Sequence, residues 1–317
     1  MKETCQIGRR DLLKGALGAF LTLSMTPIRL NAKAQDVIKK AIPSSGELIP
    51  VMGMGTSRTF DVGGDKVALS QLAQVLRVFF DNGGSVIDSS PMYGSSEKVL
   101  GELLKTTKNK ENLFSATKVW TDGKQSGIQQ MNESLNLWGL KRFDLIQIHN
   151  LRDWKVHLPT LRDWREQGKI RYIGITTSHN RRHTSHNRRH KELEHIMKTE
   201  DLDFVQFSYS IGNRISEKTL LPLAADRGIA TLINRPFERA ELFRRVEGKP
   251  LPKWASEFDC TSWAQFFLKF VISHPAVTCT IPATAKVKHM KDNMAAGSGR
   301  LPDSEIRKHM VQYFDSV

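Results

Sequence analysis

Stretches of apolar residues with two different spacings alternate along the chain from about residue 41 onward. Short apolar runs, such as 143–149, have the length of buried strands. Longer stretches repeat apolar residues every three or four positions, as expected for one face of a helix. We expect strands at 51–56, 85–88, 112–118, 143–149, 170–176, 204–208, 229–234 and 278–282, and helices at 66–82, 95–106, 124–139, 157–168, a segment ending near Lys198, 216–227, 261–273, 286–296 and 303–314.

This alternation of eight strands with helices predicts an α/β fold with a parallel sheet. Eight strand–helix units match a (β/α)8 TIM barrel, which typically takes ~250 residues. Residues 41–50 come before the first unit and predict a β-hairpin, with Ser45 and Gly46 in its turn. A doubly wound sheet is the alternative, but it would require a third glycine and a helix start after Gly53 and Gly55.

The first 34 residues have the layout of an export signal. A basic segment with Arg9 and Arg10 precedes an apolar stretch at 15–25, and the small-residue pattern of a cleavage site follows at 32–34. The apolar stretch is too short to span a bilayer. The arginine pair resembles a twin-arginine signal, although Gly8 stands where Ser or Thr is usual.

We therefore expect a signal peptide at 1–34 and a mature domain at 35–317. The twin-arginine export machinery would be a partner, and the mature protein would be periplasmic or otherwise extracytoplasmic, with no stable membrane anchor after cleavage. An uncleaved anchor and a disordered basic tail are the alternatives.

Composition changes this picture little. The chain is 39% hydrophobic and 25% charged, as is usual for a globular protein. Its net charge of +14 includes +4 in the leader, and the remaining excess suits anionic ligands as well as nucleic acid. Only Cys260 and Cys279 follow the leader, which is too few for a disulfide framework, so we expect both to behave as small apolar residues.

A perfect tandem repeat of seven residues occupies 177–183 and 184–190. On a helix its four histidines would share one face with a spacing that suits a transition metal. Duplication alone produces that spacing, so we expect a solvated insertion and no metal site. Its arginines could attract an anionic substrate or a membrane. The repeat is also the only feature that favours nucleic acid, which we do not expect as a partner.

Four chemically distinctive residues stand at or just after successive predicted strand ends: Asp88, Tyr93, Lys118 and His149. In a parallel barrel the carboxyl ends of the strands share one rim, where catalytic groups collect. Each residue alone has a simpler explanation, such as a helix cap, a solvated lysine or a hydrogen-bonded core histidine. Together, they predict a tyrosine general acid, with a lysine that lowers its pKa and a histidine that binds a carbonyl oxygen.

These residues stand in motifs that resemble the aldo-keto reductase family, from about Ala41 to Ala296. The family's Asp, Tyr, Lys and His fall on Asp88, Tyr93, Lys118 and His149. The resemblance implies hydride transfer between the nicotinamide of NADPH and a small carbonyl or alcohol substrate, with Tyr93 as the proton donor. The motifs are Asp88-x4-Tyr93-Gly94-x-Ser96-Glu97, Thr117-Lys118, Gln147 to Asn150, Gly168 to Gly174, and Ile281-Pro282 with Asn293.

The resemblance also implies a cofactor site. The nicotinamide amide would be held from the ends of the fifth and sixth strands. The phosphates would lie beyond the seventh and eighth strands, where a helix N-terminus and lysines suit them. NADPH is the expected cofactor and NADH is possible. The cofactor residues implied are Thr176, Thr177, Gln206, Asn234, Arg235, Thr284, Lys286, His289 and Asn293, with Lys288 nearby.

Substrate contacts are expected from loops over the same rim. The candidates are Met92, Trp120, Asn150 and Trp154, together with the long segment 236–257. Aromatic side chains beside a carbonyl site shape an apolar pocket, although the two tryptophans could equally pack beneath loops.

Three functions remain open from the sequence. The first is an exported NADPH-dependent carbonyl reductase. The second is a cofactor-binding redox sensor or subunit with little turnover, and the third is a dehydrogenase that oxidises a sugar or alcohol. The same groups serve both directions of the reaction, so the residues do not distinguish the first from the third.

Overall fold

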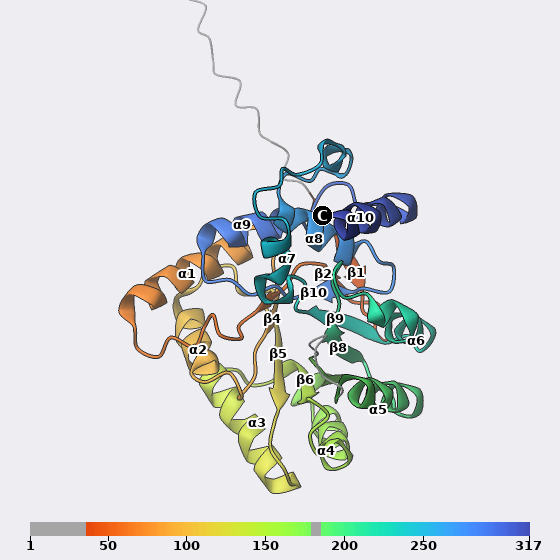
Figure 1. Ribbon diagram of the computed structural model, residues 1–317. Helices are drawn as coiled ribbons and strands as arrows, with labels where there is room; N and C mark the ends of the chain where they lie inside the picture. The colour runs from red at the N-terminus through yellow and green to blue at the C-terminus, as the bar shows by residue number, and fades with distance from the viewer. Residues whose placement is uncertain (1–35, 179–184) are drawn as a thin grey trace, which may run out of the picture. The chain divides into compact units, whose positions relative to one another are not determined.

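The computed structural model describes residues 36–178 and 185–317, with the side chains of 185–188 excepted. The chain divides after Ala34, and the described residues all belong to the second unit. The predicted leader at 1–34 and most of the seven-residue repeat lie outside the described residues. Figure 1 shows strands in the middle of this unit and helices around them.

Eight parallel strands form one sheet, ordered β10-β9-β8-β7-β6-β5-β4-β3 within the described part of the chain. The sheet closes where Met52 pairs with Thr280 and Gly53 N–H donates to the Thr280 carbonyl at 2.8 Å. This confirms the predicted (β/α)8 barrel. The strands are β3 (Met54–Gly55), β4 (Val86–Asp88), β5 (Phe114–Val119), β6 (Phe143–His149), β7 (Ile170–Thr176), β8 (Phe204–Ser208), β9 (Ala230–Asn234) and β10 (Cys279–Thr280).

The helices follow the predicted order. In Figure 1, α1 to α6 run around the strands in sequence, and α9 lies beside α1. They are α1 (Lys66–Asp81), α2 (Ser96–Thr106), α3 (Lys124–Trp138), α4 (Trp154–Glu166), α5 (Ser185–Thr199), α6 (Leu220–Asp226), α7 (Glu241–Arg245), α8 (Trp263–Ile272), α9 (Val287–Ala295) and α10 (Ser304–Ser316).

The predicted hairpin is present as β1 (Lys39–Ala41) and β2 (Leu48–Pro50), which pair antiparallel. Its Ile42 and Ile49 belong to a buried cluster that includes Phe114, Tyr172 and other side chains from the barrel strands. The Tyr172 hydroxyl also donates to Ser45 Oγ at 2.8 Å, in the hairpin turn. The hairpin therefore packs at the amino ends of the strands and leaves the carboxyl rim to the functional groups.

Several predicted boundaries are wrong. The helix expected at 216–227 is a 3-10 turn, η2 (Ile215–Lys218), followed by α6. Pro222 has no N–H for the hydrogen bond that would continue the preceding turn, and it stands in the first turn of α6, where that N–H is not needed. Helix α4 begins at Trp154, before the predicted start at 157, and tolerates Pro159 inside it. The segment expected to be a long loop contains η3 (Glu238–Ala240), α7 and η4 (Lys253–Phe258).

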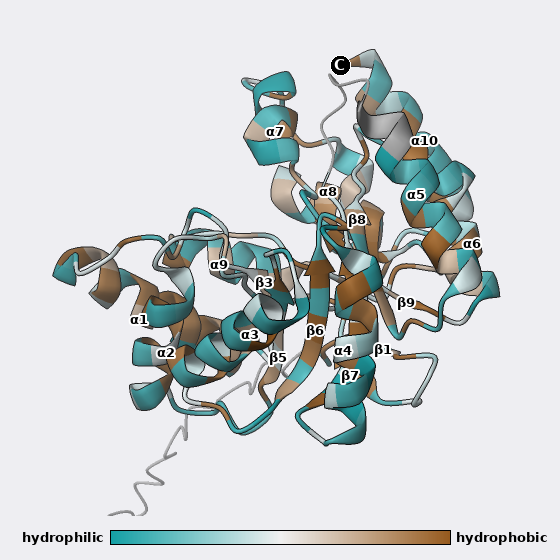
Figure 2. Cartoon of the chain, turned by 90° about the horizontal axis from the view of Figure 1, so that it is seen from below, coloured by the Kyte–Doolittle hydropathy of each residue, from teal (hydrophilic) through white to brown (hydrophobic). Residues whose placement is uncertain are grey.

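The core lies between the strands and the helices, and both Cys260 and Cys279 are buried and unpaired. In Figure 2, β6 and β8 are largely hydrophobic, whereas α3 and α5 carry mostly hydrophilic residues. Among the described residues we find no helix with the length and apolar character that a membrane span requires.

Candidate active site

Asp88 and Lys118 form a buried ion pair at the carboxyl rim of the barrel. Lys118 Nζ lies 2.6 Å from Asp88 Oδ2 and donates a second hydrogen bond to the Ser89 carbonyl at 2.7 Å. Lys118 is 0% and Asp88 2% exposed. Burial alone would lower the pKa of Lys118, but Asp88 and Tyr93 outweigh it and raise the pKa above its usual value. Lys118 is therefore a cation at neutral pH.

The other oxygen of Asp88 is held by two glutamine side chains. Gln147 Nε2 donates to Asp88 Oδ1 at 2.8 Å, and Gln206 Nε2 donates to the same atom at 3.0 Å. Gln147 stands two residues before His149 on β6, so both side chains point to the same side of the strand. These bonds fix the carboxylate, and through it the position of the ammonium group.

Tyr93 lies in the turn between β4 and α2, beside the ion pair. Lys118 Nζ is 5.1 Å from the centroid of its ring. Burial has the largest effect on the Tyr93 pKa and raises it, while the charge of Lys118 acts in the opposite direction; the net direction is upward. Lys118 therefore lowers the Tyr93 pKa as predicted, but the expectation of a pKa below the usual value is wrong, because burial outweighs the lysine. The phenol stays protonated at neutral pH and is available as a proton donor.

His149 ends β6, and its ring meets that of Tyr93 edge to face, with 5.7 Å between centroids. Its Nδ1 lies 2.8 Å from Ser90 Oγ. Burial and the nearby charge of Lys118 lower the pKa of His149 to about 2, so the imidazole is neutral at physiological pH. A neutral imidazole can donate one hydrogen bond to a substrate oxygen without adding a charge.

Glu97 is a buried carboxylate that bonds Thr117, the residue before Lys118. Its carboxylate accepts hydrogen bonds from Thr117 Oγ1 at 2.5 Å, Ser134 Oγ at 2.9 Å and Trp138 Nε1 at 3.1 Å. Burial is the largest influence on Glu97 and raises its pKa. The carboxylate joins α2 and α3 to the strand residue that precedes Lys118.

The residues expected to hold the nicotinamide gather where β7, β8 and β9 end, but their polar groups are already paired. Gln206 Oε1 accepts from Thr176 Oγ1 at 3.2 Å and from Asn234 Nδ2 at 3.3 Å. Asn234 Nδ2 also donates to the Thr177 carbonyl at 3.0 Å. With both amide hydrogens of Gln206 used by Asp88 and Gln147, this residue orients the Asp88 carboxylate. Its contact with a nicotinamide stays a prediction.

Arg235 directly follows β9 and faces the same site. Its Nη2 donates to Ser178 Oγ at 3.2 Å, and its charge acts on Tyr93. Burial, Arg239 and Arg58 lower the pKa of Arg235 to about 10, because three guanidinium groups lie near one another. This positive region near the rim suits an anionic group.

The remaining cofactor candidates surround the start of α9. No side chain caps this helix, and Lys286, Lys288 and His289 are exposed there. Thr284 Oγ1 accepts from Lys286 N–H at 3.1 Å, and Asn293 is buried on the helix. The helix N-terminus and two lysines provide donors and positive charge for a phosphate.

The substrate candidates lie in the loops after β4, β5 and β6 and, for Trp154, at the first residue of α4. Met92 is 46% exposed, whereas Trp120 and Trp154 are partly buried, and Trp154 packs against the core. The Arg152 guanidinium lies over Trp120, 4.9 Å from the ring centroid. Asn150 has φ 56°, and its buried Oδ1 has no hydrogen-bond partner among the residues that the structure describes, which sets it apart from the other candidates.

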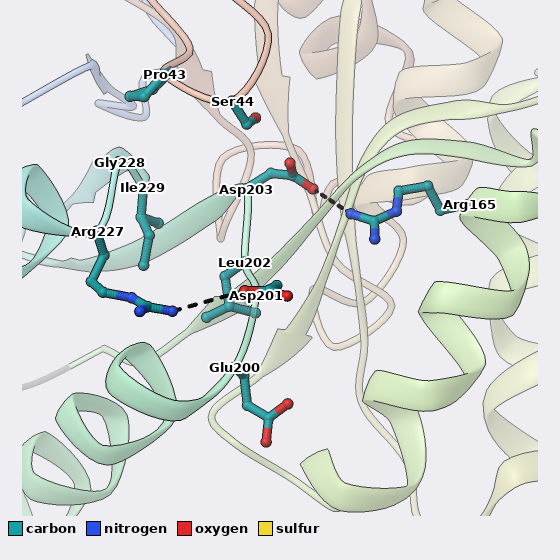
Figure 3. A pocket seen from close by; sticks show the side chains of 10 residues that line it. All are labelled: Pro43, Ser44, Arg165, Glu200, Asp201, Leu202, Asp203, Arg227, Gly228 and Ile229. Carbon is teal, nitrogen blue, oxygen red and sulfur yellow. Dashed lines mark hydrogen bonds and ion pairs between the residues drawn. The ribbon is translucent and has the colours of Figure 1, made fainter.

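A cavity of about 370 Å³ lies elsewhere, where β8 and β9 begin and the hairpin turns. Figure 3 shows Arg165 facing Asp203, and Arg227 facing Asp201. Because these residues precede their strands, this cavity belongs to the amino ends of the barrel and not to the carboxyl rim.

The histidines whose spacing could suit a metal lie in the seven-residue repeat, where no metal site was expected. His179 and His183, and the side chain of His186, lie outside the described residues, so metal binding by the repeat stays untested. Among the side chains that the structure does describe, no group of three or more His, Cys, Asp or Glu is placed to hold a metal.

The sequence did not single out Ser90 or Gln147 as contacts of the tetrad formed by Asp88, Tyr93, Lys118 and His149. Gln147 could have been identified from the sequence, because its spacing from His149 places both side chains on one face of the strand. Ser90 could not, since serine is common in turns and its presence there indicates no contact.

Comparisons with known proteins identify a family and a fold for this chain. A sequence model described as the aldo/keto reductase family matches residues 51–310. The methylglyoxal reductase YeaE of Escherichia coli K12 is 26% identical over 275 residues, covering 84% of this chain and 93% of that protein. The NADH-specific methylglyoxal reductase of the same strain is 24% identical over 270 residues, covering 72% and 78%. A Klebsiella pneumoniae aldo/keto reductase, solved with NADP and acetate, aligns with a TM-score of 0.72 at 22% identity, covering 87% of this chain and 96% of that one.

Proposed function

The chain belongs to the aldo/keto reductase family of oxidoreductases, and we propose that it reduces small carbonyl compounds with NADPH, using Tyr93 as the general acid. The observation that carries the proposal is the position of the Tyr93 ring, whose centroid is 5.1 Å from the Nζ of a buried lysine that is paired with Asp88. A proton donor next to a fixed cation suits a substrate oxygen that becomes negative during reaction.

Each member of the tetrad has a role in the proposal. Tyr93 gives its proton to the substrate oxygen, and Lys118 stabilises the negative charge that remains on the phenol. Asp88 keeps Lys118 charged in a buried site. Neutral His149 donates a hydrogen bond that orients the carbonyl. NADPH, when bound, supplies the hydride.

The residues present fit this cofactor. The uncapped start of α9, with Lys286 and Lys288 exposed beside it, suits a phosphate, and Arg235 adds a cation near Tyr93. To hold the nicotinamide amide, Thr176, Thr177 and Asn234 would exchange the hydrogen bonds that they now make to one another and to Gln206. NADH remains an option, because one relative is named for NADH specificity.

The proposed substrate class is small aldehydes and α-dicarbonyls, since two relatives are named methylglyoxal reductases. Met92, Trp120, Asn150 and Trp154 would line the approach to the carbonyl. Oxidation of an alcohol uses the same groups in reverse.

A panel assay tests this function. The protein from Gln35 onward is incubated with NADPH or NADH and a series of aldehydes, α-dicarbonyls and alcohols, and nicotinamide absorbance is followed. Turnover of a small carbonyl with NADPH supports the proposal. Tight NADPH binding with no turnover on any compound would contradict it and favour a redox sensor.

Export of the protein is a separate proposal. Residues 1–34 would direct a folded, cofactor-loaded domain to the twin-arginine machinery and be removed before Gln35, releasing a periplasmic enzyme. N-terminal sequencing of protein from the periplasmic fraction should begin near Gln35. Full-length protein that starts at Met1, or a fusion whose export survives replacement of Arg9 and Arg10 by lysine, would overturn the proposal.

A further inference from the structure

Ser90 contacts both the proton donor and the histidine of the site. Its carbonyl accepts from the Tyr93 N–H at 3.0 Å, which closes a turn with Pro91 in the second position. Its hydroxyl oxygen lies 2.8 Å from His149 Nδ1 and accepts from the Met92 N–H at 3.2 Å. Ser90 is 0% exposed, so water does not compete for these bonds.

The other hydrogen-bond partner of Ser90 indicates which atom carries the hydrogen in its bond to His149. A serine hydroxyl has one hydrogen to donate and two lone pairs. Met92 already donates to this oxygen, and within the described residues the hydroxyl has no acceptor other than His149 Nδ1. A buried hydroxyl hydrogen without an acceptor would be unfavourable. Ser90 therefore donates and Nδ1 accepts.

We propose that Ser90 is a positioning residue that holds His149 in the tautomer with its proton on Nε2. Nε2 lies across the ring from Nδ1, so this tautomer directs an N–H donor away from Ser90. In the other tautomer, Nε2 would present a lone pair to the substrate oxygen and repel it. The catalytic consequence rests on the function proposed above, whereas the tautomer itself is a property of the protein without ligands.

The arrangement also ties two groups to one turn. The backbone of Ser90 fixes the start of the segment that carries Tyr93, and its side chain fixes the ring of His149. A rotation of that ring about its Cβ–Cγ bond would exchange Nδ1 for a carbon and lose the hydrogen bond. Ser90 thus fixes the position of Tyr93, the proposed acid, relative to His149, the proposed hydrogen-bond donor to the substrate carbonyl.

Nitrogen NMR of the histidine-labelled protein from Gln35 onward measures the tautomer directly. The coupling pattern between ring nitrogens and carbon-bound protons distinguishes the two neutral forms. The His149 signal is assigned by its loss in His149→Gln. We expect protonated Nε2 in the wild type and a mixture of the two tautomers in Ser90→Ala. Protonated Nδ1 in the wild type, or an unchanged tautomer in Ser90→Ala, would overturn the inference, whether or not the protein reduces any carbonyl.

Kinetics supply the second readout. Ser90→Ala should lower kcat roughly tenfold, the scale of one lost hydrogen bond, with the KM for NADPH unchanged, and Ser90→Thr should recover most of the loss. Ser115→Ala is the matched control, because Ser115 is a buried serine that bonds Asp144 at the amino end of β5. Equal losses of kcat in Ser90→Ala and Ser115→Ala would show a general packing effect and contradict the positioning role.

Discussion

Replacing Asp88 by asparagine tests the buried ion pair at the centre of the site. The two side chains have nearly the same shape, so the variant changes charge more than packing. The new amide can keep the hydrogen bonds from Gln147 and Gln206 only if its oxygen replaces Oδ1. Its NH2 group then points at Lys118 Nζ, where Oδ2 stood 2.6 Å away. Two donors would face each other in a site that excludes water.

The expected cost is large. Removing one partner of a buried pair leaves the other charge uncompensated and costs about 3–5 kcal/mol. For a domain of this size, that corresponds to a fall in Tm of roughly 5–8 °C. Burial is the largest influence on the Lys118 pKa and lowers it, so loss of the Asp88 charge should lower the pKa of this lysine and favour its neutral form. Turnover should therefore fall together with stability.

Urea unfolding of four proteins measures the effect: wild type, Asp88→Asn, Lys118→Met and the double variant. Because the double variant removes both charges, it should recover most of the stability lost by Asp88→Asn while remaining inactive. A loss below about 1 kcal/mol in Asp88→Asn, or additive losses in the double variant, would refute the reasoning that Lys118 is a buried cation held by Asp88.

Two further predictions concern His149 and Glu97. The pKa of His149 is about 2 in the fold and 6.5 in the unfolded chain, so as pH falls below 6.5 only the unfolded chain takes up this proton. Stability is fully present above pH 6.5 and should fall by about 2 kcal/mol between pH 6.5 and 5 from this residue; His149→Gln should remove that part of the slope in urea unfolding, and an unchanged slope would contradict the assignment. Glu97→Leu leaves three buried donors without their acceptor and should cost at least ~3 kcal/mol, whereas Glu97→Gln should cost about 1 kcal/mol; equal costs in urea unfolding would exclude this role of the carboxylate.

Most of the barrel followed from the sequence, because each strand and each long helix has its own hydrophobic period. The exceptions have local causes. Pro222 interrupts a helical pattern, and the short helices between β9 and α8 are too brief to show a period. The sheet also closes through two-residue strands at β3 and β10, with a single bridge between Met52 and Thr280. Spacing alone does not reveal pairing that short.

The positions of the four site residues were predictable because parallel strands bring their carboxyl ends to one rim. Their pKa values were not, because those depend on burial. Lys118 does favour ionisation of Tyr93, but burial outweighs it. The pairing of Gln206 with Asp88 links β8 to β4 across the barrel, and a contact of that kind depends on side-chain rotamers that no spacing encodes.

The central claim is that Tyr93 donates the proton, and a single-turnover experiment tests it most directly. Wild type and Tyr93→Phe are loaded with NADPH, mixed with methylglyoxal, and followed by nicotinamide absorbance. The variant loses only the hydroxyl, so it should fold and bind NADPH as the wild type does. We expect rapid decay in the wild type and a loss of at least about 100-fold in the variant, the usual scale of general acid catalysis. Equal decay rates in both proteins would contradict the account.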